Sequence, residues 1–469
     1  MTESSENTMS GQSLTDEGID ALVIGAGPSG ATAARVLAES GYRVTVLEQG
    51  DWPSVADYPS TSLERELVVA GPWNPNPNIR KGPSDYPVND DEADVHTFMF
   101  NGVGGSSVMF GAEWPRMIPS DFRVRTLDGV ADDWPLTYED LQPYYEMVDE
   151  IIGVSGLGGN TAYPPGAAPP QPPLPIGRIG RIAARGMNKL GYQWWPGTHA
   201  ILSKPADGRS ACARWATCVA GCPEGAKSSF DVSMWPGALA AGVQLVTGAR
   251  VREITVSARG LATGATWIDR SGVEHHTKAP VVVVCANGVG TPRLLLLSSS
   301  KLFPDGLANS SGYVGHNLMM HPTATVLGGY EEDLQSYLGP IGNPIWSMQF
   351  AETDTTRGFH RGSKWTIAGV PGPVELLQRI YSMPLVQRSG AAGHELVERF
   401  CGRSFEWVAA IEDLPEFDNT VTLDPQLVDS DGIPAPKLRY KMSEESSRAL
   451  DWHIDRLTEV HEASGAVFT

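Results

Sequence analysis

The sequence predicts an α/β fold with two lobes, of which the first is built on a parallel sheet. Three observations support this fold class. A short apolar run at residues 20–24 (DALVI) leads through a glycine-rich turn into a helical stretch and a β-branched run, the pattern of a βαβ unit. A further run at residues 279–286 (APVVVVCA) is typical of a buried parallel strand. The length of 469 residues exceeds the size at which a single hydrophobic core keeps growing.

The chain begins with a polar, acidic segment that precedes the first strand. Residues 1–18 contain neither the basic nor the apolar part of a signal peptide, so we expect a disordered leader and a cytoplasmic protein. Export together with a signal-bearing partner stays open. No apolar run approaches the ~18 residues of a membrane-spanning helix, so no direct membrane span is expected. The net charge of -20 argues against nucleic acid or an anionic membrane surface as the main partner.

The glycine-rich turn after the first strand has the spacing of a dinucleotide-binding motif. Gly25, Gly27 and Gly30 form the pattern GxGxxG ahead of a helix at residues 31–40. The first glycine permits a tight turn, the second lets the backbone approach a pyrophosphate, and the third lets the helix pack on the strand. The helix N-terminus, where Ser29 lies, offers unpaired N–H groups and a partial positive charge to phosphates. We therefore predict that these four residues bind a dinucleotide; a purely structural turn is the alternative.

A carboxylate at the end of the second strand supports this prediction. The strand at residues 43–48 (RVTVLE) ends in Glu48, where a carboxylate can accept hydrogen bonds from both ribose hydroxyls. Glu48 would repel a 2'-phosphorylated ribose, so the pattern disfavours NADP. It does not choose between FAD and NAD.

Beyond the βαβ unit, the pattern alternates between loops, helices and strands. Thr137 and Asp140 form a capping box at the start of a predicted helix. The predicted elements are a surface excursion at 51–95, a helix at 134–153, a proline-rich loop at 163–175, a helix at 231–241, strands within 243–256, a helix at 291–299 and a last helix at 444–464.

A second glycine-rich segment lies at residues 101–122 (NGVGGSSVMFGAEWPRMIPSDF). Gly104 and Gly105 let the backbone approach a bulky planar cofactor, and Ser106 and Ser107 can bond phosphate or flavin oxygens. A glycine-rich surface loop is the alternative. The segment resembles the flavin-binding signature of the glucose–methanol–choline (GMC) oxidoreductases, and the resemblance implies that Gly104, Gly105, Ser106 and Met109 contact FAD.

Further stretches resemble the same family in the same order. Residues 249–254, with Val251, are similar to its second adenine-contacting strand, residues 281–300 to its segment around Ala286, and residues 315–322 to its Gly-x-Asn-Leu-x-x-His-Pro turn. We interpret His316 and His321 in this turn as packing or turn-bonding residues. The resemblance implies that Val251 and Ala286 also bind the cofactor.

The resemblance also implies a domain organisation and an activity. It implies a Rossmann-like FAD-binding domain with a parallel sheet at residues 19–125 and 205–322, a helical and proline-rich excursion at 126–204, and an α+β substrate domain on an antiparallel sheet at 323–469. The expected activity is oxidation of a CH–OH group of a sugar, polyol or other alcohol by hydride transfer to FAD. Met109 and Phe110 stand where a His-Trp pair supports a covalent flavin in some relatives, so non-covalent FAD is expected.

Two other functions stay open from the sequence. One is a nicotinamide-dependent dehydrogenase that shares only the first βαβ unit. The other is a truncated or non-catalytic protein with the flavin fold, because the family normally continues past a point like Thr469. We expect the catalytic base in that later segment, so the catalytic residues are unknown. His453 and His461 are expected on the solvated face of the last helix.

Three cysteines form a cluster near the start of the second half of the predicted FAD-binding domain. Cys212, Cys218 and Cys222 lie within eleven residues, and Pro223 follows the third. The cluster suits an iron–sulfur centre that passes electrons from flavin to an electron-accepting partner subunit, although the usual ligand spacing is missing. Buried or redox-active thiols, and a zinc site, are the alternatives.

Aromatic residues are interspersed with polar ones in the predicted substrate domain. An aromatic-lined sheet suits a small-molecule sugar or polyol substrate, which offers apolar ring faces with hydroxyls at the rim. A plain core role is the alternative for each of them. The residues are Tyr330, Trp346, Phe350, Phe359, Trp365, Phe405 and Trp407.

Overall fold

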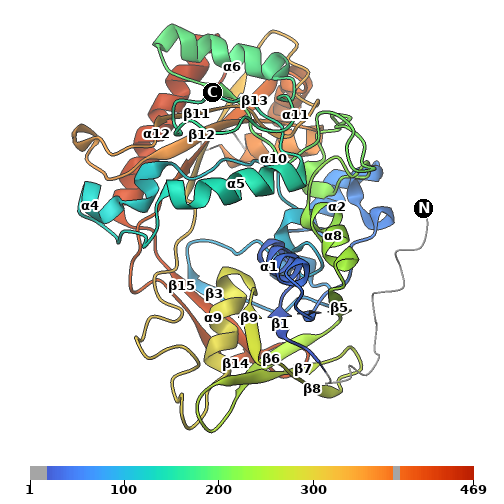
Figure 1. Ribbon diagram of the computed structural model, residues 1–469. Helices are drawn as coiled ribbons and strands as arrows, with labels where there is room; N and C mark the ends of the chain where they lie inside the picture. Colours follow the sequence, from blue (N-terminus) through green and yellow to red (C-terminus); the bar gives the residue numbers. More distant parts are fainter. Residues whose placement is uncertain (1–17, 384–390) are drawn as a thin grey trace.

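The computed structural model describes residues 18–383 and 391–469, so the predicted leader lies outside the described residues except for Gly18. The chain forms two lobes (Figure 1). One contains the predicted parallel sheet, and the other contains a five-stranded antiparallel sheet. Among the described residues, no helix combines the length and the apolar character that crossing a membrane requires.

The parallel sheet has the strand order β5-β2-β1-β9. β1 (Ala21–Ile24) and β2 (Val44–Glu48) are joined through α1 (Pro28–Glu39), which confirms the predicted βαβ unit. β5 (Gln244–Thr247) and β9 (Val281–Val284) pair with β2 and β1 in parallel. The carboxyl ends of four strands therefore meet at one edge, beside the N-terminus of α1.

β9 corrects one expectation. Its β-branched residues form the predicted parallel strand, but Val281 is 51% exposed because β9 is the edge strand of the sheet. A run of valines indicates a strand in an α/β fold, whereas its place at the edge or centre depends on the order of strands.

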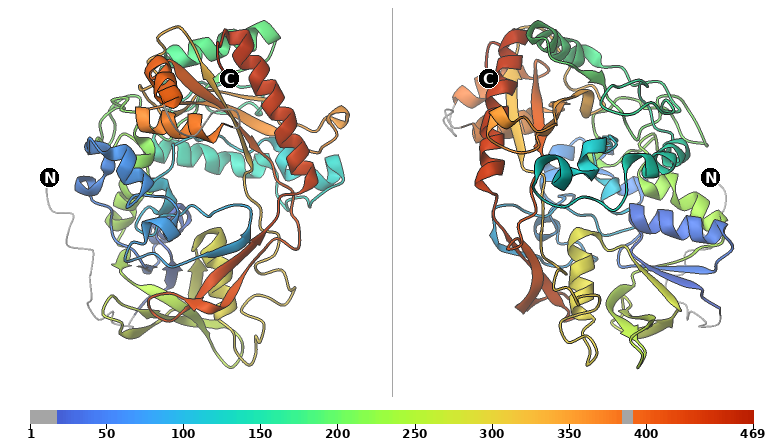
Figure 2. Two further views of the ribbon diagram at one scale, coloured as in Figure 1. Left: turned by 180° about the vertical axis from the view of Figure 1, so that it is seen from behind. Right: turned by 60° about the vertical axis from the view of Figure 1, so that its left-hand side comes forward.

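Two small sheets complete the first lobe. One is antiparallel and holds β6 (Arg250–Val256), β7 (Ala262–Ile268) and β8 (Glu274–Lys278). The other holds β14 (Thr420–Val428), β15 (Pro434–Tyr440) and β3 (Asn89–Ala93), with α9 (Asn287–Leu297) packed on it. Figure 2 shows the β14–β15 hairpin beside the first lobe. The chain thus returns to this lobe within the segment that the sequence prediction assigns to the substrate domain.

The second lobe is built on the sheet β10-β13-β12-β11-β4. α12 (Glu444–Ser464) and α6 (Gly177–Leu190) pack against each other and against this sheet (Figure 2). The strands are β10 (Thr323–Gly329), β13 (Ser404–Ile411), β12 (Ser363–Gly369), β11 (Gly342–Phe350) and the short β4 (Trp195–Pro196). α6 and β4 come from the predicted excursion at 126–204, so that segment supplies part of this lobe.

The remaining helices connect and cover the two lobes. α5 (Tyr138–Ile152) lies between them in Figure 1 and has the predicted capping box, in which Thr137 Oγ1 accepts from Asp140 N at 3.3 Å. The predicted helix at 231–241 is divided into α7 (Phe230–Ser233) and α8 (Trp235–Ala240). The others are α2 (Arg65–Ala70), α3 (Pro77–Arg80), α4 (Val124–Asp128), α10 (Pro373–Ser382) and α11 (Ala391–Phe400).

The aromatic residues of the second lobe form its core rather than a substrate-facing surface. Most of them pack between the five-stranded sheet and the helices α6 and α12. Trp365, Phe405 and Trp407 alternate with polar residues along their strands and are almost completely buried. The alternative core role is therefore the better interpretation of these residues.

The expectation for the histidines of the last helix is wrong. His453 and His461 are both 0% exposed, on the stripe of α12 that faces the sheet. His461 Nε2 donates to Val326 O at 2.9 Å while its Nδ1 accepts from the Tyr330 hydroxyl at 2.8 Å. Burial lowers the pKa of His461 to about 4 and that of His453 to about 3, so both rings are neutral.

Candidate functional site

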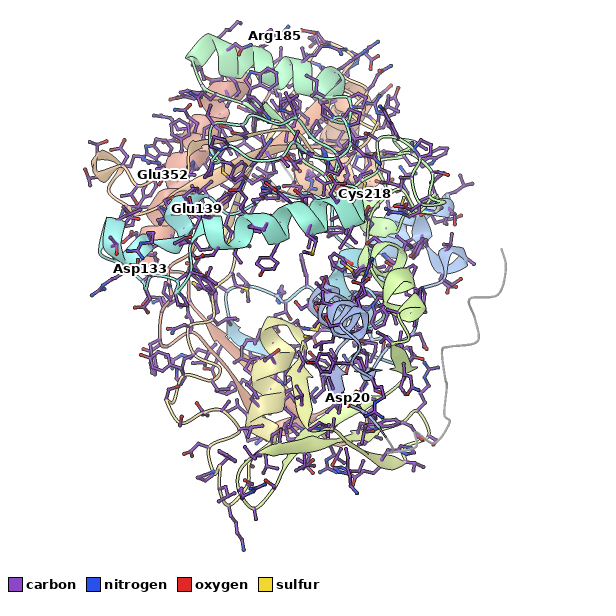
Figure 3. All side chains as sticks on the ribbon, viewed as in Figure 1. Asp20, Asp133, Glu139, Arg185, Cys218 and Glu352 are labelled. Carbon is purple, nitrogen blue, oxygen red and sulfur yellow. The ribbon has the colours of Figure 1, made fainter. Side chains whose placement is uncertain are left out.

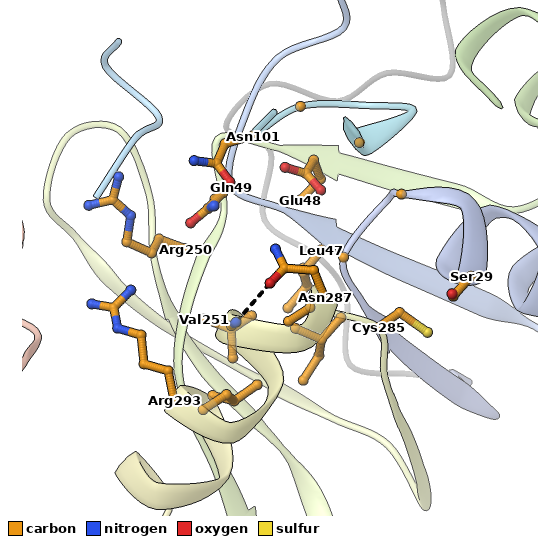
Figure 4. A pocket seen from close by; sticks show the side chains of 18 of the residues that line it. Ser29, Leu47, Glu48, Gln49, Asn101, Arg250, Val251, Cys285, Asn287 and Arg293 are labelled. Atoms are coloured by element: carbon orange, nitrogen blue, oxygen red, sulfur yellow. Dashed lines mark hydrogen bonds between the residues drawn. The ribbon is translucent and has the colours of Figure 1, made fainter. Parts of the chain in front are cut away.

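A cavity lies at the carboxyl edge of the parallel sheet, where the β1–α1 turn meets the segment at 101–106. Its walls come from the ends of β1, β2 and β9, the start of α1, β6 and α9. Figure 4 shows Glu48, Gln49 and Asn101 above Val251 and Asn287. Of the predicted cofactor residues, those that line the cavity are Gly25, Gly27, Ser29, Glu48, Gly105, Ser106, Val251 and Ala286.

The two glycine-rich segments touch each other at this cavity. A Cβ added to Gly105, whose φ is +53°, would lie 2.8 Å from the Cα of Gly27. Gly25 has φ +100°, and a side chain there would meet the backbone of Cys285 at the end of β9. Gly30 lies against the carbonyl of Gly25 beneath the turn, as its predicted packing role requires. Only glycine fits both the conformation and the close approach at Gly25 and Gly105.

Glu48 is buried under the β1–α1 turn. Its Oε2 accepts from Ala26 N at 2.8 Å and its Oε1 accepts from Gly50 N at 2.9 Å. Burial raises the pKa of Glu48, while the hydrogen bonds from Gly50 and Ala26 oppose this shift. Each oxygen keeps a further lone pair, so the carboxylate braces the turn and can still accept from a ligand.

Gly104 and Met109 lie behind the lining of the cavity. Gly104 (φ +91°) is packed against Asp231, and an added Cβ would lie 2.9 Å from the backbone N of Asp231. Ser107 Oγ donates to Gly104 O at 2.6 Å and accepts from Phe230 N at 2.9 Å. Met109 is buried directly after the short 3₁₀ helix at Gly105–Val108. These residues shape the loop that presents Gly105 and Ser106.

Sequence reasoning missed two arginines at the cavity. Arg250 precedes Val251 on β6, and Arg293 lies on α9. Arg293 Nη2 lies 2.8 Å from Asp429 Oδ2, and Arg250 Nη1 lies 2.8 Å from Asp431 Oδ2. Both acidic partners belong to the turn between β14 and β15, which the sequence pattern assigned to the other domain. The pairing depends on a long-range contact and has no local signal.

A second cavity, of about 920 Å³, lies next to the five-stranded sheet. Its walls come from residues 115–121, residues 319–321 and the strands β12 and β13. Most of the lining is apolar, and it includes Met117, Met319, Met320, Met348 and Trp134. His321 also lines it and is exposed, whereas His316 bonds to Phe417 O at 2.8 Å and stacks on the Phe417 ring as a packing residue.

One end of this cavity is held by a buried arginine. Arg361 is 1% exposed, pairs with Asp121 and lies 3.0 Å from Glu412 and 3.4 Å from Glu352. Asp121 and Glu412 line the cavity. Burial raises the pKa of Glu412 to about 7, since the attraction of Arg361 offsets only part of the desolvation.

The three clustered cysteines are free thiols. Burial raises the pKa of Cys212 to about 11, and the neighbouring Cys218 and Cys222 add to the shift. Cys218 and Asp133 lie at opposite ends of the region between the lobes in Figure 3. Within residues 18–383 and 391–469, no three His, Cys, Asp or Glu side chains are arranged to hold a metal ion. The iron–sulfur interpretation therefore stays a prediction without support from the described geometry.

Known proteins resemble this chain over most of its length. Residues 19–323 match the family model of the GMC oxidoreductases. The chain belongs to the GMC oxidoreductase family. This confirms the predicted family and, with it, the predicted FAD-dependent oxidoreductase.

The relatives of this GMC oxidoreductase include two dehydrogenases. It is 39% identical to the 2-methyl-1,2-propanediol dehydrogenase of Mycolicibacterium austroafricanum over 455 residues, which are 96% of this chain and 82% of the relative. It is 28% identical to the fructose dehydrogenase large subunit of Gluconobacter japonicus, over 95% of this chain and 84% of the relative.

Solved structures share the fold of this GMC oxidoreductase. The pyridoxine 4-oxidase from Mesorbium loti superposes with a TM-score of 0.62 at 16% identity, over 96% of this chain and 82% of the other. A formate oxidase from Aspergillus oryzae, in a structure that addresses its FAD modification, gives a TM-score of 0.61 at 14% identity, over 95% and 82% of the two chains. The predicted fold class, with its parallel and antiparallel sheets, is confirmed.

Proposed function

We propose that this GMC oxidoreductase oxidises a CH–OH group of a small, partly apolar diol or alcohol and holds FAD without a covalent bond. The observation that carries the proposal is the contact between the two glycine-rich segments at one cavity. Gly27 and Gly105 come from turns far apart in the sequence, and a side chain at Gly105 would fill the space between them. Such a cradle is what a nucleotide cofactor requires of the backbone.

The residues around the cradle fit a flavin nucleotide. The N-terminus of α1 presents the unpaired N–H groups of Gly27 and Ser29 to a pyrophosphate, and Ser29 and Ser106 add hydroxyl groups. Glu48 accepts from ribose hydroxyls at the end of β2. When bound, FAD accepts the hydride from the alcohol carbon. Met109, which cannot form a histidyl link, supports non-covalent binding.

The second cavity supports a substrate that is less polar than a sugar. Its four methionines and Trp134 contribute an adaptable apolar surface, while charged residues that include Lys364 and Glu412 supply polar groups. A diol with a short branched carbon chain offers hydroxyls to these polar groups and methyl groups to the methionines. The similarity to 2-methyl-1,2-propanediol dehydrogenase supports the same class of substrate.

A partner subunit as electron acceptor is a further part of the proposal. Its support is the similarity to a protein named as the large subunit of fructose dehydrogenase, because that name implies at least one further subunit. The acceptor can be checked by comparing the rate of oxygen consumption with the rate of dye reduction while substrate is oxidised. Dye reduction without oxygen consumption is expected; equal rates would contradict a partner-dependent dehydrogenase.

The function is tested with the purified full-length protein. We expect the visible absorption of oxidised flavin, loss of that absorption on anaerobic addition of 2-methyl-1,2-propanediol, and slower loss with fructose or glucose. Acid precipitation should release the yellow colour into the supernatant. A colourless protein that does not take up FAD would overturn the cofactor assignment. Faster reduction by glucose would overturn the substrate class alone, and a yellow precipitate would overturn non-covalent binding.

A further inference from the structure

A buried lysine connects the loop at residues 104–110 to the turn at residues 218–222. Lys227 is 1% exposed, and its Nζ donates to Val108 O at 2.7 Å, to Cys218 O at 2.7 Å and to Phe110 O at 3.4 Å. An ammonium has three N–H donors, so these three carbonyls satisfy it completely. The predicted cofactor contacts do not include this residue.

Two of the three carbonyls belong to the loop that forms one side of the cradle. Val108 is the last residue of the 3₁₀ helix (Gly105–Val108) that presents Gly105 and Ser106 to the cavity, and Phe110 follows two residues later. Lys227 therefore holds the far end of the turn that approaches Gly27.

A second attachment holds the same loop from the neighbouring chain segment. Ser107 Oγ accepts from Phe230 N at 2.9 Å and donates to Gly104 O at 2.6 Å. Lys227 and Phe230 are three residues apart in the chain, so one segment at residues 227–231 carries both attachments. Asp231 in this segment packs against Gly104. The loop is thus fastened at its start by Phe230 and Asp231 and at its end by Lys227.

The third carbonyl, that of Cys218, connects the segment at residues 227–231 to the turn at residues 218–222. Besides the bond from Lys227 Nζ to Cys218 O, Cys222 Sγ accepts from the backbone N of Lys227 at 3.4 Å. Gly221 in the same turn packs on the ring of Tyr58. A buried ammonium is costly, and removal of its donors would leave buried carbonyls without a hydrogen-bond partner.

We propose that Lys227 is a positioning residue for the cofactor: it fixes the loop at residues 104–110 against the turn at residues 218–222 and so sets the distance between Gly105 and Gly27. The proposal rests on the proposed binding of FAD in this cradle. A lysine with only a structural role would affect the stability of the protein but not the affinity of the folded protein for FAD. The two roles can therefore be separated by a binding measurement.

The test measures the dissociation constant of FAD by titrating the FAD-depleted protein and following flavin fluorescence. The variant Lys227→Met keeps the aliphatic chain and removes the donors, and Lys204→Met, at an exposed lysine, is the matched control. We expect about tenfold weaker binding or more for K227M, which corresponds to about 1.4 kcal/mol, and unchanged binding for K204M. K227R should lie between wild type and K227M, because a guanidinium keeps the charge but cannot place its donors on the same three carbonyls.

Two outcomes overturn the inference. One is a folded K227M, judged by circular dichroism, that binds FAD as tightly as K204M. The other concerns S107A, which removes the second attachment of the loop. The double variant S107A/K227M should lose less FAD affinity than the losses of the two single variants added together. A loss equal to that sum would mean that the two attachments act independently, and it would overturn the inference. If K227M does not fold, wild-type-like FAD affinity of K227R overturns it instead. If the wild-type protein does not bind FAD, the proposed function itself is contradicted. This outcome is therefore distinguishable from a failure of the inference about Lys227.

Discussion

Gly105 shows how one position controls the cradle. Its φ of +53° is unfavourable for residues with a side chain, and its neighbour across the cavity is the Cα of Gly27 rather than a flexible group. A side chain at this position therefore carries two costs, one in the backbone conformation and one in the approach of two backbones. These two costs can be separated by experiment, because another glycine of the chain has a positive φ but no close neighbour.

Gly105→Ala is expected to lose FAD binding, with at least about tenfold weaker affinity, because the added Cβ lies 2.8 Å from Gly27 Cα and forces the segments apart. Gly41→Ala is the matched control, since Gly41 has φ +89° and nothing within 4 Å of an added Cβ. It should lose about 1 kcal/mol of stability and keep its FAD. Equal flavin content of the two purified variants would contradict the role of Gly105.

At the scale of elements, α12 depends on two buried histidines for its docking on the five-stranded sheet. His453 Nδ1 accepts from Trp365 Nε1 at 2.9 Å, and His461 bridges Tyr330 and Val326. Because burial disfavours the charged ring, each histidine is neutral in the folded protein and takes up a proton only in more acidic solution than in the unfolded chain. The helix therefore links the stability of the second lobe to pH.

His461→Gln is expected to destabilise the protein by about 2–3 kcal/mol at pH 7.5, because two buried hydrogen bonds are lost or weakened. The pKa of His461 is about 4 when folded, against a usual value of 6.5, so acid favours the unfolded wild-type chain between these values. At pH 5 this lowers wild-type stability by about 2 kcal/mol, and the deficit of the variant should shrink by that amount. Urea unfolding at the two pH values measures the change, with exposed His276→Gln as control. A deficit that is independent of pH would argue against a neutral, buried ring.

At the scale of the whole molecule, Arg361 joins segments that are far apart in the chain. Asp121 and Asp128 follow the loop at residues 104–110, whereas Arg361 precedes β12 and Glu412 follows β13. One guanidinium thus faces carboxylates from both parts of the chain at the wall of the second cavity. Without it, the mostly buried carboxylates of Asp121 and Asp128 would lose their cationic partner while Glu412 remains close to them.

Arg361→Met is expected to lower stability by about 3–5 kcal/mol at pH 8, because the buried carboxylates lose their partner. The pKa of Asp121 is already raised and that of Glu412 is about 7 with the arginine present. Removing the cation raises these pKa values further, so protonation at pH 5 should relieve the repulsion and reduce the deficit. Thermal unfolding at both pH values is the measurement. Arg178→Met, at an exposed pair with Asp333, should change stability by less than about 1 kcal/mol, and an equally small effect of R361M would refute the prediction.

The sequence predicted the parts of the site that depend on local patterns. The βαβ unit, the glycines, Glu48 and the cap of α5 each have a signal within a few residues, and the structure has them where expected. The burial of His453 and His461 also had a local signal that was missed: with Leu457 and Val460 they form a helical i, i+4, i+7, i+8 stripe. The charged residues on the other faces of α12 concealed it.

Other features had no local signal. The edge position of β9, the return of β14 and β15 to the first lobe, and the pairing of Arg250 and Arg293 with Asp431 and Asp429 all depend on which segments meet in space. Lys227 likewise has the sequence context of an ordinary charged loop residue, and only the structure shows its three carbonyl partners. The predicted domain boundaries did not anticipate these crossings.

The sequence by itself determined the βαβ unit with its glycine turn, and its motifs resemble those of the GMC oxidoreductases. Glycine spacing, helix caps and β-branched runs are legible in this way because they act through neighbouring residues. Only the tertiary structure decided that Gly27 and Gly105 touch, that Lys227 fastens the loop behind them, and that the aromatic residues of the second lobe fill its core. The physical reason is that burial and close approach are properties of pairs brought together by folding, and a linear pattern does not specify the pair.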